Sequence, residues 1–444
     1  NSYFSLIEDL NKINDQNLVW LSSVTSSRNI FISRIFFYLC LKSLIDKNIN
    51  QINSYKKIIV DNKTIYKYLL SCNIDRSKIS SVNLLHISDY FLKFKHLLIN
   101  LFFIFFLKIF SKKNKLFSSP FFFQIPISSS YKIENSSSKL ANFSNNIYAN
   151  KIIYVPYLIT KSLYEILNLL KLSKQKNILI KQSYISVKQY FNIFKSLIFN
   201  RNIIYPKNIK NYQKNIICYE INKNLYHPTT LDSLEFFYFI KNLQSKNIEP
   251  HFISIFENST INKLWHLSIN KYFNNSINNG LKFMIPVRNY FSQYYISKSE
   301  HKIRLTPKKI IVGSKVLRKQ LILDNPHLAN SYIDGSFIIP SNNNINKKRK
   351  AIIFFSSILN FETTKILTLL NNIKIFENYD YYIKFHPSFN NSVINTFLKM
   401  VPNIFKINNN LSIYNISNES IVISGMSTIL VDAINSNLNS IYFD

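Results

Sequence analysis

The sequence is poor in residues that cross-link a chain or bend it sharply. Its 444 residues include only 4 glycines, 3 cysteines and 8 histidines. With so few glycines, each is expected to mark a place where the backbone needs one. The cysteines, Cys40, Cys72 and Cys218, are odd in number, lie far apart and form no Cys-x-x-Cys pair. They are expected to be reduced cysteines that pack as small apolar side chains.

Acidic residues are also scarce. Asp and Glu number 23 against 55 Lys and Arg, which gives a formal net charge of +32. Such a surface attracts polyanions, namely nucleic acids, anionic lipids or phosphorylated substrates, although part of the charge reflects a composition typical of an AT-rich genome. Apolar residues make up 47% of the chain, which excludes a disordered protein. The length suits two domains, and because the chain begins at Asn and not Met, we expect it to be part of a longer one.

Strand-like and helix-like segments alternate along the first 300 residues. Residues 55–74 read as a strand followed by a helix, and further strands are expected at 215–223 and 250–259. A helical apolar face extends over 231–244, and the His-Pro pair at 227–228 is expected to lie in a loop. This alternation predicts an α/β architecture with parallel sheets.

From residue 301 the alternation becomes more regular. The runs KKIIV, AIIFF, YYIKF and IVIS each read as a strand that is followed by a helix. We therefore predict two Rossmann-like domains, 1–300 and 301–444, with a hinge between 295 and 345. Because ligands bind outside the carboxyl ends of parallel strands, the two domains are expected to face each other across one cleft.

One segment departs from this pattern. Residues 91–115 contain the apolar run Leu97–Leu107, which is interrupted only by Asn100 and has lysines on both sides. The run is shorter than the roughly 20 apolar residues of a membrane span. It suits a helix that lies in an anionic membrane interface, and it equally suits a buried core helix with basic ends.

A Ser-Gly-Met-Ser-Thr turn at 424–428 separates an expected buried strand from an expected helix. Gly425 would permit a tight turn after Ser424, and Ser427 and Thr428 would begin the helix. Unpaired N–H groups and the positive end of the helix dipole favour an anion there, so the turn is a candidate phosphate site. Plain capping of the helix by Ser427 is the structural alternative.

His386 follows the expected strand YYIKF and precedes Pro387. As a strand-end residue it is expected at the same edge of the sheet as the 424–428 turn. Together they suit a nucleotide-activated substrate whose phosphate leaves during the reaction. Lys384, on the same strand face as His386, and Ser356 and Ser357, which follow the first strand of this domain, are candidates for the same pocket.

These motifs resemble those of a known family. Lys-x-His-Pro at 384–387, followed by a strand and Ser-Gly-x-Ser-Thr with Asp432-Ala433, is similar to the donor domain of GT-B glycosyltransferases of surface polysaccharide synthesis. Sialyltransferase-like and Kdo-transferase-like enzymes, which use CMP-sugars, share such motifs. The segments WLSSVTSSRNIFIS, LDSLEFFYF and 250–290 resemble surface carbohydrate biosynthesis proteins of lipopolysaccharide and capsule loci. The chain departs from that family at Ser259, where the family has Gln.

The resemblance implies a GT-B-like fold and inverting transfer of a sugar from a nucleotide-sugar, with a CMP-activated ulosonic acid as one candidate, to a lipid-linked or glycan acceptor. Such a reaction needs a base for the acceptor hydroxyl and stabilisation of the departing phosphate. Glu257, at the carboxyl end of a first-domain strand, is the expected base, with a capping or salt-bridged glutamate as the alternative. His386 is expected to contact the donor phosphate or to act as an acid toward it, and Arg28 is a further candidate for substrate binding.

No Asp-x-Asp motif and no His or Cys cluster in the sequence indicates a metal, so we expect transfer without a metal or other cofactor. The expected partners are the nucleotide-sugar, the acceptor and an anionic membrane surface, at the cytoplasmic face of the membrane. No nucleic-acid-binding module is recognisable. Two other classes stay open: a nucleotide-sugar epimerase or polyol-phosphate transferase on the same scaffold, and a non-catalytic basic protein that binds membranes or nucleic acid.

Overall fold

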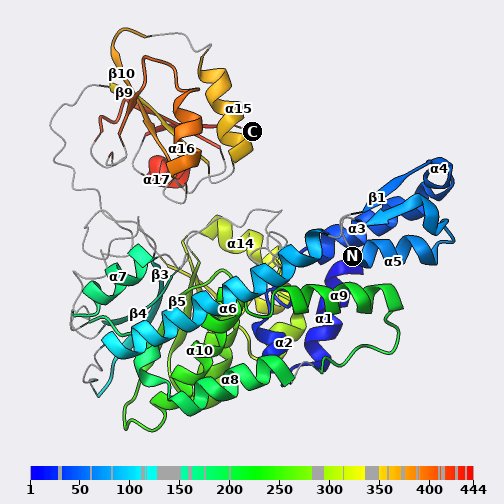
Figure 1. Cartoon of the computed structure of the whole chain (residues 1–444). Helices are drawn as coiled ribbons and strands as arrows, with labels where there is room; N and C mark the ends of the chain where they lie inside the picture. The colour runs from blue at the N-terminus through cyan, green and yellow to red at the C-terminus, as the bar shows by residue number, and fades with distance from the viewer. Residues whose placement is uncertain are drawn as a thin grey trace. The chain divides into compact units, whose positions relative to one another are not determined.

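The computed structural model describes residues 2–28, 33–60, 63–81, 84–111, 116, 118–127, 152–158, 163–174, 177–199, 202–282, 295–313, 315–335, 350–357, 360–371, 376–386, 389, 391–408, 411, 416–425, 429–435 and 438–443. They fall into two compact units, of which the first holds the elements from α1 to β8 and the second those from β9 to β13 (Figure 1). Each unit has its own sheet and its own core.

The first unit is built on a six-stranded sheet with the order β4-β3-β5-β6-β7-β8. Its strands are β3 (Phe121–Ile127), β4 (Ile152–Leu158), β5 (His251–Ile255), β6 (Asn278–Lys282), β7 (Lys309–Val312) and β8 (Tyr332–Asp334). β3 and the strands from β5 to β8 pair in parallel. From β3 the chain adds β4 on one side and then β5 on the other. The order of the strands therefore reverses between β3 and β5, the position at which open α/β sheets bind ligands.

Helices surround this sheet and extend away from it. They include α1 (Ser2–Ile13), α2 (Leu18–Ser22), α3 (Ile35–Lys47), α4 (Ile49–Ser54), α5 (Lys63–Ser71), α6 (Leu84–Phe110), α7 (Leu163–Leu172), α8 (Val187–Phe199), α9 (Asn211–Lys223), α10 (Pro228–Leu243), α11 (Thr260–Tyr272), α13 (Lys298–Lys302) and α14 (Lys315–Asp324). Trp265 of α11 is fully buried between Phe236 of α10 and Phe252 of β5, with edge-to-face ring contacts to both. These aromatic contacts fix α10 and α11 against the sheet.

The expected βα unit at 55–74 is confirmed, because β1 (Ile58–Val60) is followed by α5. β1 pairs in parallel with β2 (Ile79–Ser81) in a separate two-stranded sheet. Among the described helices, none combines the length and the apolar character that a membrane crossing requires.

One local prediction in the first unit is wrong. The strand expected at 215–223 lies within the helix α9, because its buried residues Ile216, Ile217, Glu220 and Ile221 recur at helical spacing and face the core. This periodicity outweighs the β-branched composition of the segment. His227 lies in the loop before α10, as expected, but it is also the N-cap of that helix, since its Nδ1 accepts a hydrogen bond from the backbone N–H of Thr229 over 3.2 Å.

The structure places the boundary between the units after Gly335, inside the predicted hinge of 295–345 but later than the predicted boundary between residues 300 and 301. β7 is a strand as expected, but it extends the first sheet, and β8, which was not predicted from the sequence, follows it there. Gly280 of β6 is the register partner of Ile310, and Ile310 is the register partner of Tyr332. Strand periodicity identifies such segments without indicating which sheet they join.

The second unit carries a five-stranded parallel sheet with the order β11-β10-β9-β12-β13. Its elements are β9 (Lys350–Phe355), α15 (Asn360–Leu370), β10 (Tyr379–Lys384), α16 (Asn391–Leu398), β11 (Lys406–Ile407), β12 (Ile421–Ser424), α17 (Ile429–Asn435) and β13 (Asn439–Tyr442). In chain order this is 3-2-1-4-5, the order of a doubly wound Rossmann sheet, with the reversal between β9 and β12. The α/β class and the two Rossmann-like units predicted from the sequence are therefore confirmed.

Candidate functional site

In the second unit, four residues singled out in the sequence meet where the strand order reverses. Ser424 at the end of β12 is the register partner of Phe355 at the end of β9, and its Oγ donates to the Phe355 carbonyl over 2.8 Å. Ser356 and Ser357 follow β9 and are buried, and a Cβ on Gly425 would lie 3.5 Å from Cβ of Ser357. This edge is the ligand-binding crevice of doubly wound sheets.

Position 425 requires glycine because a side chain would be crowded there. The backbone angle is not the reason, since φ of Gly425 is not positive. A Cβ at this position would approach Oε2 of Glu362, in the first turn of α15, to 2.9 Å. The carboxylate of Glu362 therefore lies beside Gly425, in the turn that the sequence predicts as a phosphate site. Ser427 and Thr428, the other predicted members of this turn, lie outside the described residues.

The His386 backbone N–H donates to Oγ of Ser356 over 2.6 Å, which connects the end of β10 to the segment after β9. The imidazole is partly buried, and this burial lowers its pKa below the ordinary value of 6.5. At neutral pH the ring is therefore uncharged and can offer one hydrogen-bond donor and one acceptor. The structure thus favours a hydrogen-bonding histidine at this edge over a cationic one.

Lys384 makes its hydrogen bonds to backbone groups on both sides of the strand end. Its Nζ donates to the backbone carbonyl of Leu411 over 2.8 Å, and its own carbonyl accepts the N–H of Ser356 over 3.1 Å. Burial lowers the pKa of its ammonium group. Its charge orders the backbone at Leu411, so Lys384 supports the edge that carries His386 through backbone contacts.

The reversal point of the first unit, between β3 and β5, is organised by Asn262 in the first turn of α11. Its Nδ2 donates to Oε1 of Gln124 on β3 over 2.9 Å and to the carbonyl of Ile255 on β5 over 2.8 Å. Its Oδ1 accepts the backbone N–H of Glu257 over 3.0 Å and the hydroxyl of Ser259 over 3.0 Å. One amide thus fixes the loop that follows β5 and places Glu257 at the carboxyl edge of the sheet, as the sequence predicted.

Asn258, next in this loop, is in an unfavourable state. It is fully buried with a φ of 53°, in the left-handed region, and neither polar atom of its side chain has a hydrogen-bond partner among the described residues. Nε2 of Gln124 also lacks a partner within the described chain. A buried polar group without a hydrogen bond costs stability, and so does a left-handed backbone conformation at a residue other than glycine. Such features gather at functional sites.

Glu257 and Lys282 form the ionisable part of this edge. Burial raises the pKa of the Glu257 carboxyl above its ordinary 4.5, and the charge of Lys282, at the end of the neighbouring β6, partly offsets this. Burial lowers the pKa of Lys282 to about 8, against the opposing effect of Glu257. The Glu257 side chain is partly exposed and its carboxylate has no hydrogen-bond donor among the described residues. A reachable carboxylate with a raised pKa suits a general base.

Arg28, predicted to bind substrate, lies in a fully buried ion cluster. Its guanidinium pairs with Glu300 of α13 and donates to the carbonyl of Tyr295 over 3.1 Å, and Lys263 of α11 pairs with the same carboxylate. Burial alone would raise the pKa of Glu300, but Arg28 and Lys263 hold it at about 2. The cluster joins the loop after α2 to α11 and α13. Because no part of Arg28 reaches the surface, its position indicates packing and not contact with a substrate.

Sequence reasoning missed Gln124, Asn258, Lys263 and Lys282. The sequence offered one signal for Gln124, which interrupts the apolar run FFFQIPI. A single polar residue in a buried strand needs a hydrogen-bond partner or has a functional role. Lys282 carries a similar signal at the end of its strand, whereas the partners of Lys263 are remote in sequence and could not be read.

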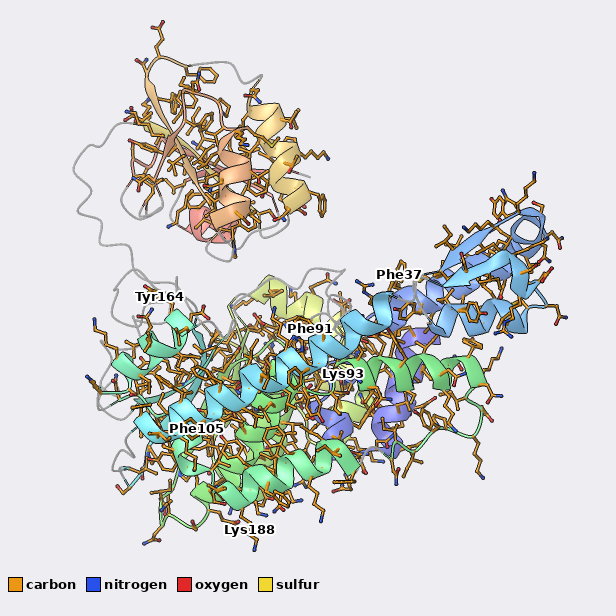
Figure 2. All side chains as sticks on the ribbon, viewed as in Figure 1. Phe37, Phe91, Lys93, Phe105, Tyr164 and Lys188 are labelled. Atoms are coloured by element: carbon orange, nitrogen blue, oxygen red, sulfur yellow. The ribbon has the colours of Figure 1, made fainter. Side chains whose placement is uncertain are left out.

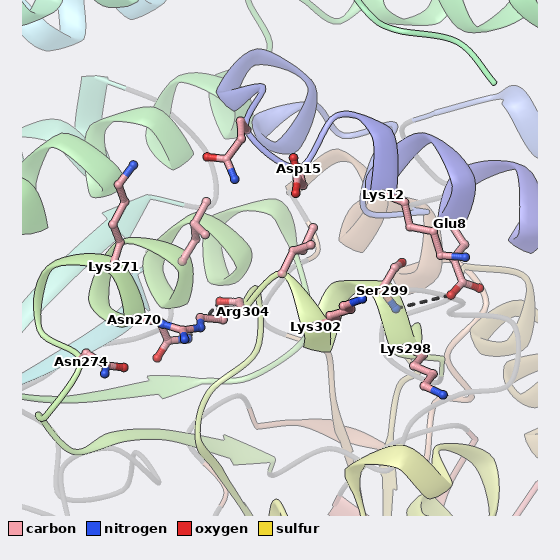
Figure 3. A pocket seen from close by; sticks show the side chains of 13 residues that line it. Glu8, Lys12, Asp15, Asn270, Lys271, Asn274, Lys298, Ser299, Lys302 and Arg304 are labelled. Atoms are coloured by element: carbon pink, nitrogen blue, oxygen red, sulfur yellow. Dashed lines mark hydrogen bonds between the residues drawn. The ribbon is translucent and has the colours of Figure 1, made fainter. Parts of the chain in front are cut away.

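The first unit also has an open hollow of about 1090 Å³ near the last turn of α11, and none of the residues described above at the reversal point between β3 and β5 lines it (Figure 3). Charged residues line it from α1 and the turn after it, from α11 and from the segment 298–304: Glu8, Lys12, Asp15, Lys271, Lys298, Lys302 and Arg304. None of the site residues predicted from the sequence lies there.

No family model and no curated protein sequence matches this chain. Solved structures with a similar arrangement include a co-structure of S. aureus MnaA with UDP (9% identity, TM-score 0.39, covering 73% of this chain and 78% of that chain). A second is UDP-GlcNAc 2-epimerase from Neisseria meningitidis bound to UDP-GlcNAc (11%, TM-score 0.37, 73% and 81%). A third is the N-terminal domain of Candida albicans trehalose-6-phosphate phosphatase (10%, TM-score 0.38, 74% and 87%). With TM-scores below 0.5, these likenesses assign no activity to this chain.

Proposed function

We propose that the chain is a glycosyltransferase of surface polysaccharide biosynthesis that transfers a sugar from a nucleotide-sugar with inversion. The observation that carries the proposal is the meeting of Ser356, Ser357, Ser424 and Gly425 at the reversal point of the second sheet, with His386 bonded to Ser356 beside them. In doubly wound sheets this crevice binds nucleotides. The second unit is therefore the proposed donor-binding domain.

Glu257 is the proposed base of the first unit. It would take the proton of the acceptor hydroxyl as that oxygen bonds to the anomeric carbon of the donor. The bond between this carbon and the phosphate oxygen breaks, and its electron pair leaves with the nucleotide. A neutral His386 would donate a hydrogen bond to the departing phosphate. This sugar transfer needs no oxidant or reductant, and we propose that it proceeds without a metal.

The donor proposed from the motifs is a nucleotide-sugar, with a CMP-activated ulosonic acid as the first to test, and the acceptor is a lipid-linked or other glycan. A nucleotide-sugar epimerase is the second candidate. It is favoured by Glu257 and Lys282, whose pKa values are shifted toward neutrality from opposite sides, as a base and an acid on one sugar would require.

A titration of the full chain with CMP, CDP, UMP, UDP and GDP tests the donor site, because a ligand of the folded state also raises the melting temperature. Gly425→Val is expected to abolish nucleotide binding, since its side chain would displace Glu362 into the crevice. Gly313→Val, at an exposed glycine after β7, is the matched control and is expected to bind normally. Equal binding by both variants would contradict the proposed site.

Product analysis then separates the candidates. Incubation with a nucleotide-sugar is expected to release free nucleotide, faster when an acceptor glycan is present, if the chain transfers sugar. Conversion to a second nucleotide-sugar without release would identify an epimerase. Retention of DNA in a gel at physiological salt, with no nucleotide binding, would instead favour a nucleic-acid-binding protein.

A further inference from the structure

The helix α6 exposes a continuous apolar stripe. The residues of the stripe each expose between 43% and 67% of their surface to solvent. They are Phe91, Phe94, Leu98, Leu101, Phe102, Phe105 and Ile109. They recur every three or four residues, so they lie along one side of the helix. The opposite side, with Phe103, Ile104 and Leu107, is buried. α6 is therefore anchored to the first unit by one face, and the other face is left exposed by the described residues of that unit.

The stripe continues onto the neighbouring helix α7, which exposes Leu163, Tyr164 and Leu167 (Figure 2). A hollow of about 320 Å³ between the two helices is lined by apolar side chains: Leu98, Ile99 and Phe102 of α6, and Leu163 and Ile166 of α7. These residues make one surface, here called the α6–α7 face. From Phe91 to Ile109 it extends roughly 27 Å, at 1.5 Å per helical residue.

Among the described residues of this face and its border, the exposed charges have one sign. Residues 91–110 contain no Asp or Glu, and the one acidic residue of α7, Glu165, is buried. Exposed lysines border the apolar residues: Lys95 on α6, Lys171 on α7 and Lys188 on α8. Lys188 belongs to this border because Lys108 of α6 donates to the carbonyl of Ile185, three residues before it. The occupant must therefore be apolar in the middle and anionic at its rim.

We propose that the α6–α7 face docks on an anionic lipid surface, with α6 lying parallel to the membrane plane. Aromatic side chains with lysines beside them are the anchors of interfacial helices, because the rings enter the acyl boundary and the ammonium groups stay at the headgroups. A second copy of the chain fits less well, since face-to-face pairing would bring these lysines against each other without a compensating carboxylate. The inference does not depend on the sugar-transfer chemistry.

Flotation of the full chain with vesicles tests the proposal. We expect binding to vesicles of phosphatidylethanolamine and phosphatidylglycerol, and little binding to phosphatidylcholine alone. The triple variant Phe94→Ser, Leu98→Ser, Phe105→Ser should lower the partition coefficient at least about 100-fold, because three apolar side chains no longer leave water. The matched control is Leu323→Ser, Phe361→Ser, Leu369→Ser, at apolar positions that are equally exposed on α14 and α15. It should change partition by less than about threefold.

A charge series separates docking from general attraction by the net charge of +32. Lys95→Gln, Lys171→Gln, Lys188→Gln should lower binding to the anionic vesicles about 100-fold. Lys12→Gln, Lys271→Gln, Lys302→Gln removes the same charge from the hollow in Figure 3 and should have little effect. Equal losses in both triple variants, or no flotation of the unmodified chain, would overturn the proposal.

A direct depth measurement completes the test. Phe105→Trp is expected to show a blue-shifted emission and quenching by brominated acyl chains when anionic vesicles are added, and Phe361→Trp is not. Melting curves and nucleotide titrations of each variant show whether the fold and the donor site remain intact, so a failure of docking is distinguishable from a failure of the proposed function. Should the apolar triple variant lower the mass in light scattering while flotation stays unchanged, the face is a contact between copies and the proposal is wrong.

Discussion

The hydroxyl of Ser424 donates to the backbone carbonyl of Phe355 over 2.8 Å and ties the carboxyl end of β12 to that of β9. Because both groups are buried, this bond holds together the two strand ends that border the proposed donor crevice. It also engages the hydroxyl hydrogen of Ser424, which the sequence suggested as a donor to a bound phosphate.

Ser424→Ala is therefore expected to act on stability. It should lower the free energy of unfolding by about 1–3 kcal/mol, since a buried carbonyl loses its donor, and change nucleotide affinity little. Ser245→Ala is the control, because its hydroxyl makes a similar bond, to the carbonyl of Asn242, at an exposed position. Denaturant titration and calorimetric nucleotide binding measure the two effects. Lost affinity with unchanged stability would restore Ser424 as a direct phosphate contact.

His386→Ala separates chemistry from architecture at the same edge. The bond to Ser356 uses the backbone N–H of His386 and survives the substitution, so the melting temperature should stay within a few degrees. Sugar transfer should fall about 10²–10⁴-fold, the usual effect of removing an acid–base or charge-stabilising group. If instead the variant unfolds while the folded fraction binds nucleotide normally, the histidine is structural.

The pH profile should report on Glu257. Its pKa is raised by burial and held down in part by Lys282, so activity is expected to rise with pH through an apparent pKa above 4.5 as the carboxylate forms. Lys282→Met removes the offsetting charge and should shift this acidic limb upward, whereas Glu257→Gln should remove it. kcat/KM between pH 4 and 9 is the measurement. An unchanged limb in Lys282→Met would show that another group titrates.

The buried cluster around Glu300 predicts a large loss of stability. Glu300→Gln leaves Arg28 and Lys263 buried without their shared carboxylate and should cost about 3–5 kcal/mol. Glu419→Gln breaks the exposed pair with Lys350 and should change stability far less, because solvent screens that pair. The stability of each variant is measured from its denaturant midpoint. Similar small losses would mean that the buried cations find other partners.

His266 predicts sensitivity to acid. It is fully buried, its ring nitrogens bond to Oγ of Ser254 and Oδ1 of Asn278, and burial lowers its pKa to about 3. Below the unfolded pKa of about 6.5 the unfolded chain binds one more proton at this residue than the folded chain. The contribution of this residue is thus fully present above pH 6.5 and is lost by up to about 1.4 kcal/mol per pH unit as pH falls toward 3. In the His266→Gln variant the melting temperature should fall less between pH 7 and 5 than in the unmodified chain. An equal fall in both would show that His266 does not cause the sensitivity to acid.

Several features of the fold follow from local sequence. The strands at 350–355, 379–384 and 421–424 contain the apolar runs AIIFF, YYI and IVI, and α10 shows its helical face over 231–244, so local sequence locates them. The placement of Ser356, His386 and Gly425 at one edge also follows, because parallel strands must end on the same side. These conclusions depend only on which residues are neighbours along the chain and on the geometry of a βα unit.

The tertiary structure decided what depends on contacts between distant segments. β7 joins the first sheet because it pairs with β6, and β8 joins it by pairing with β7, which periodicity does not encode. Ile216 and Ile217 are helical because their neighbours bury that face, and Arg28 is inaccessible because Glu300, 272 residues away, holds it inside. Whether the apolar face of α6 is core or surface likewise depended on the helices beside it. The sequence by itself determined where the chain is apolar, and packing determined which of those residues remain at the surface.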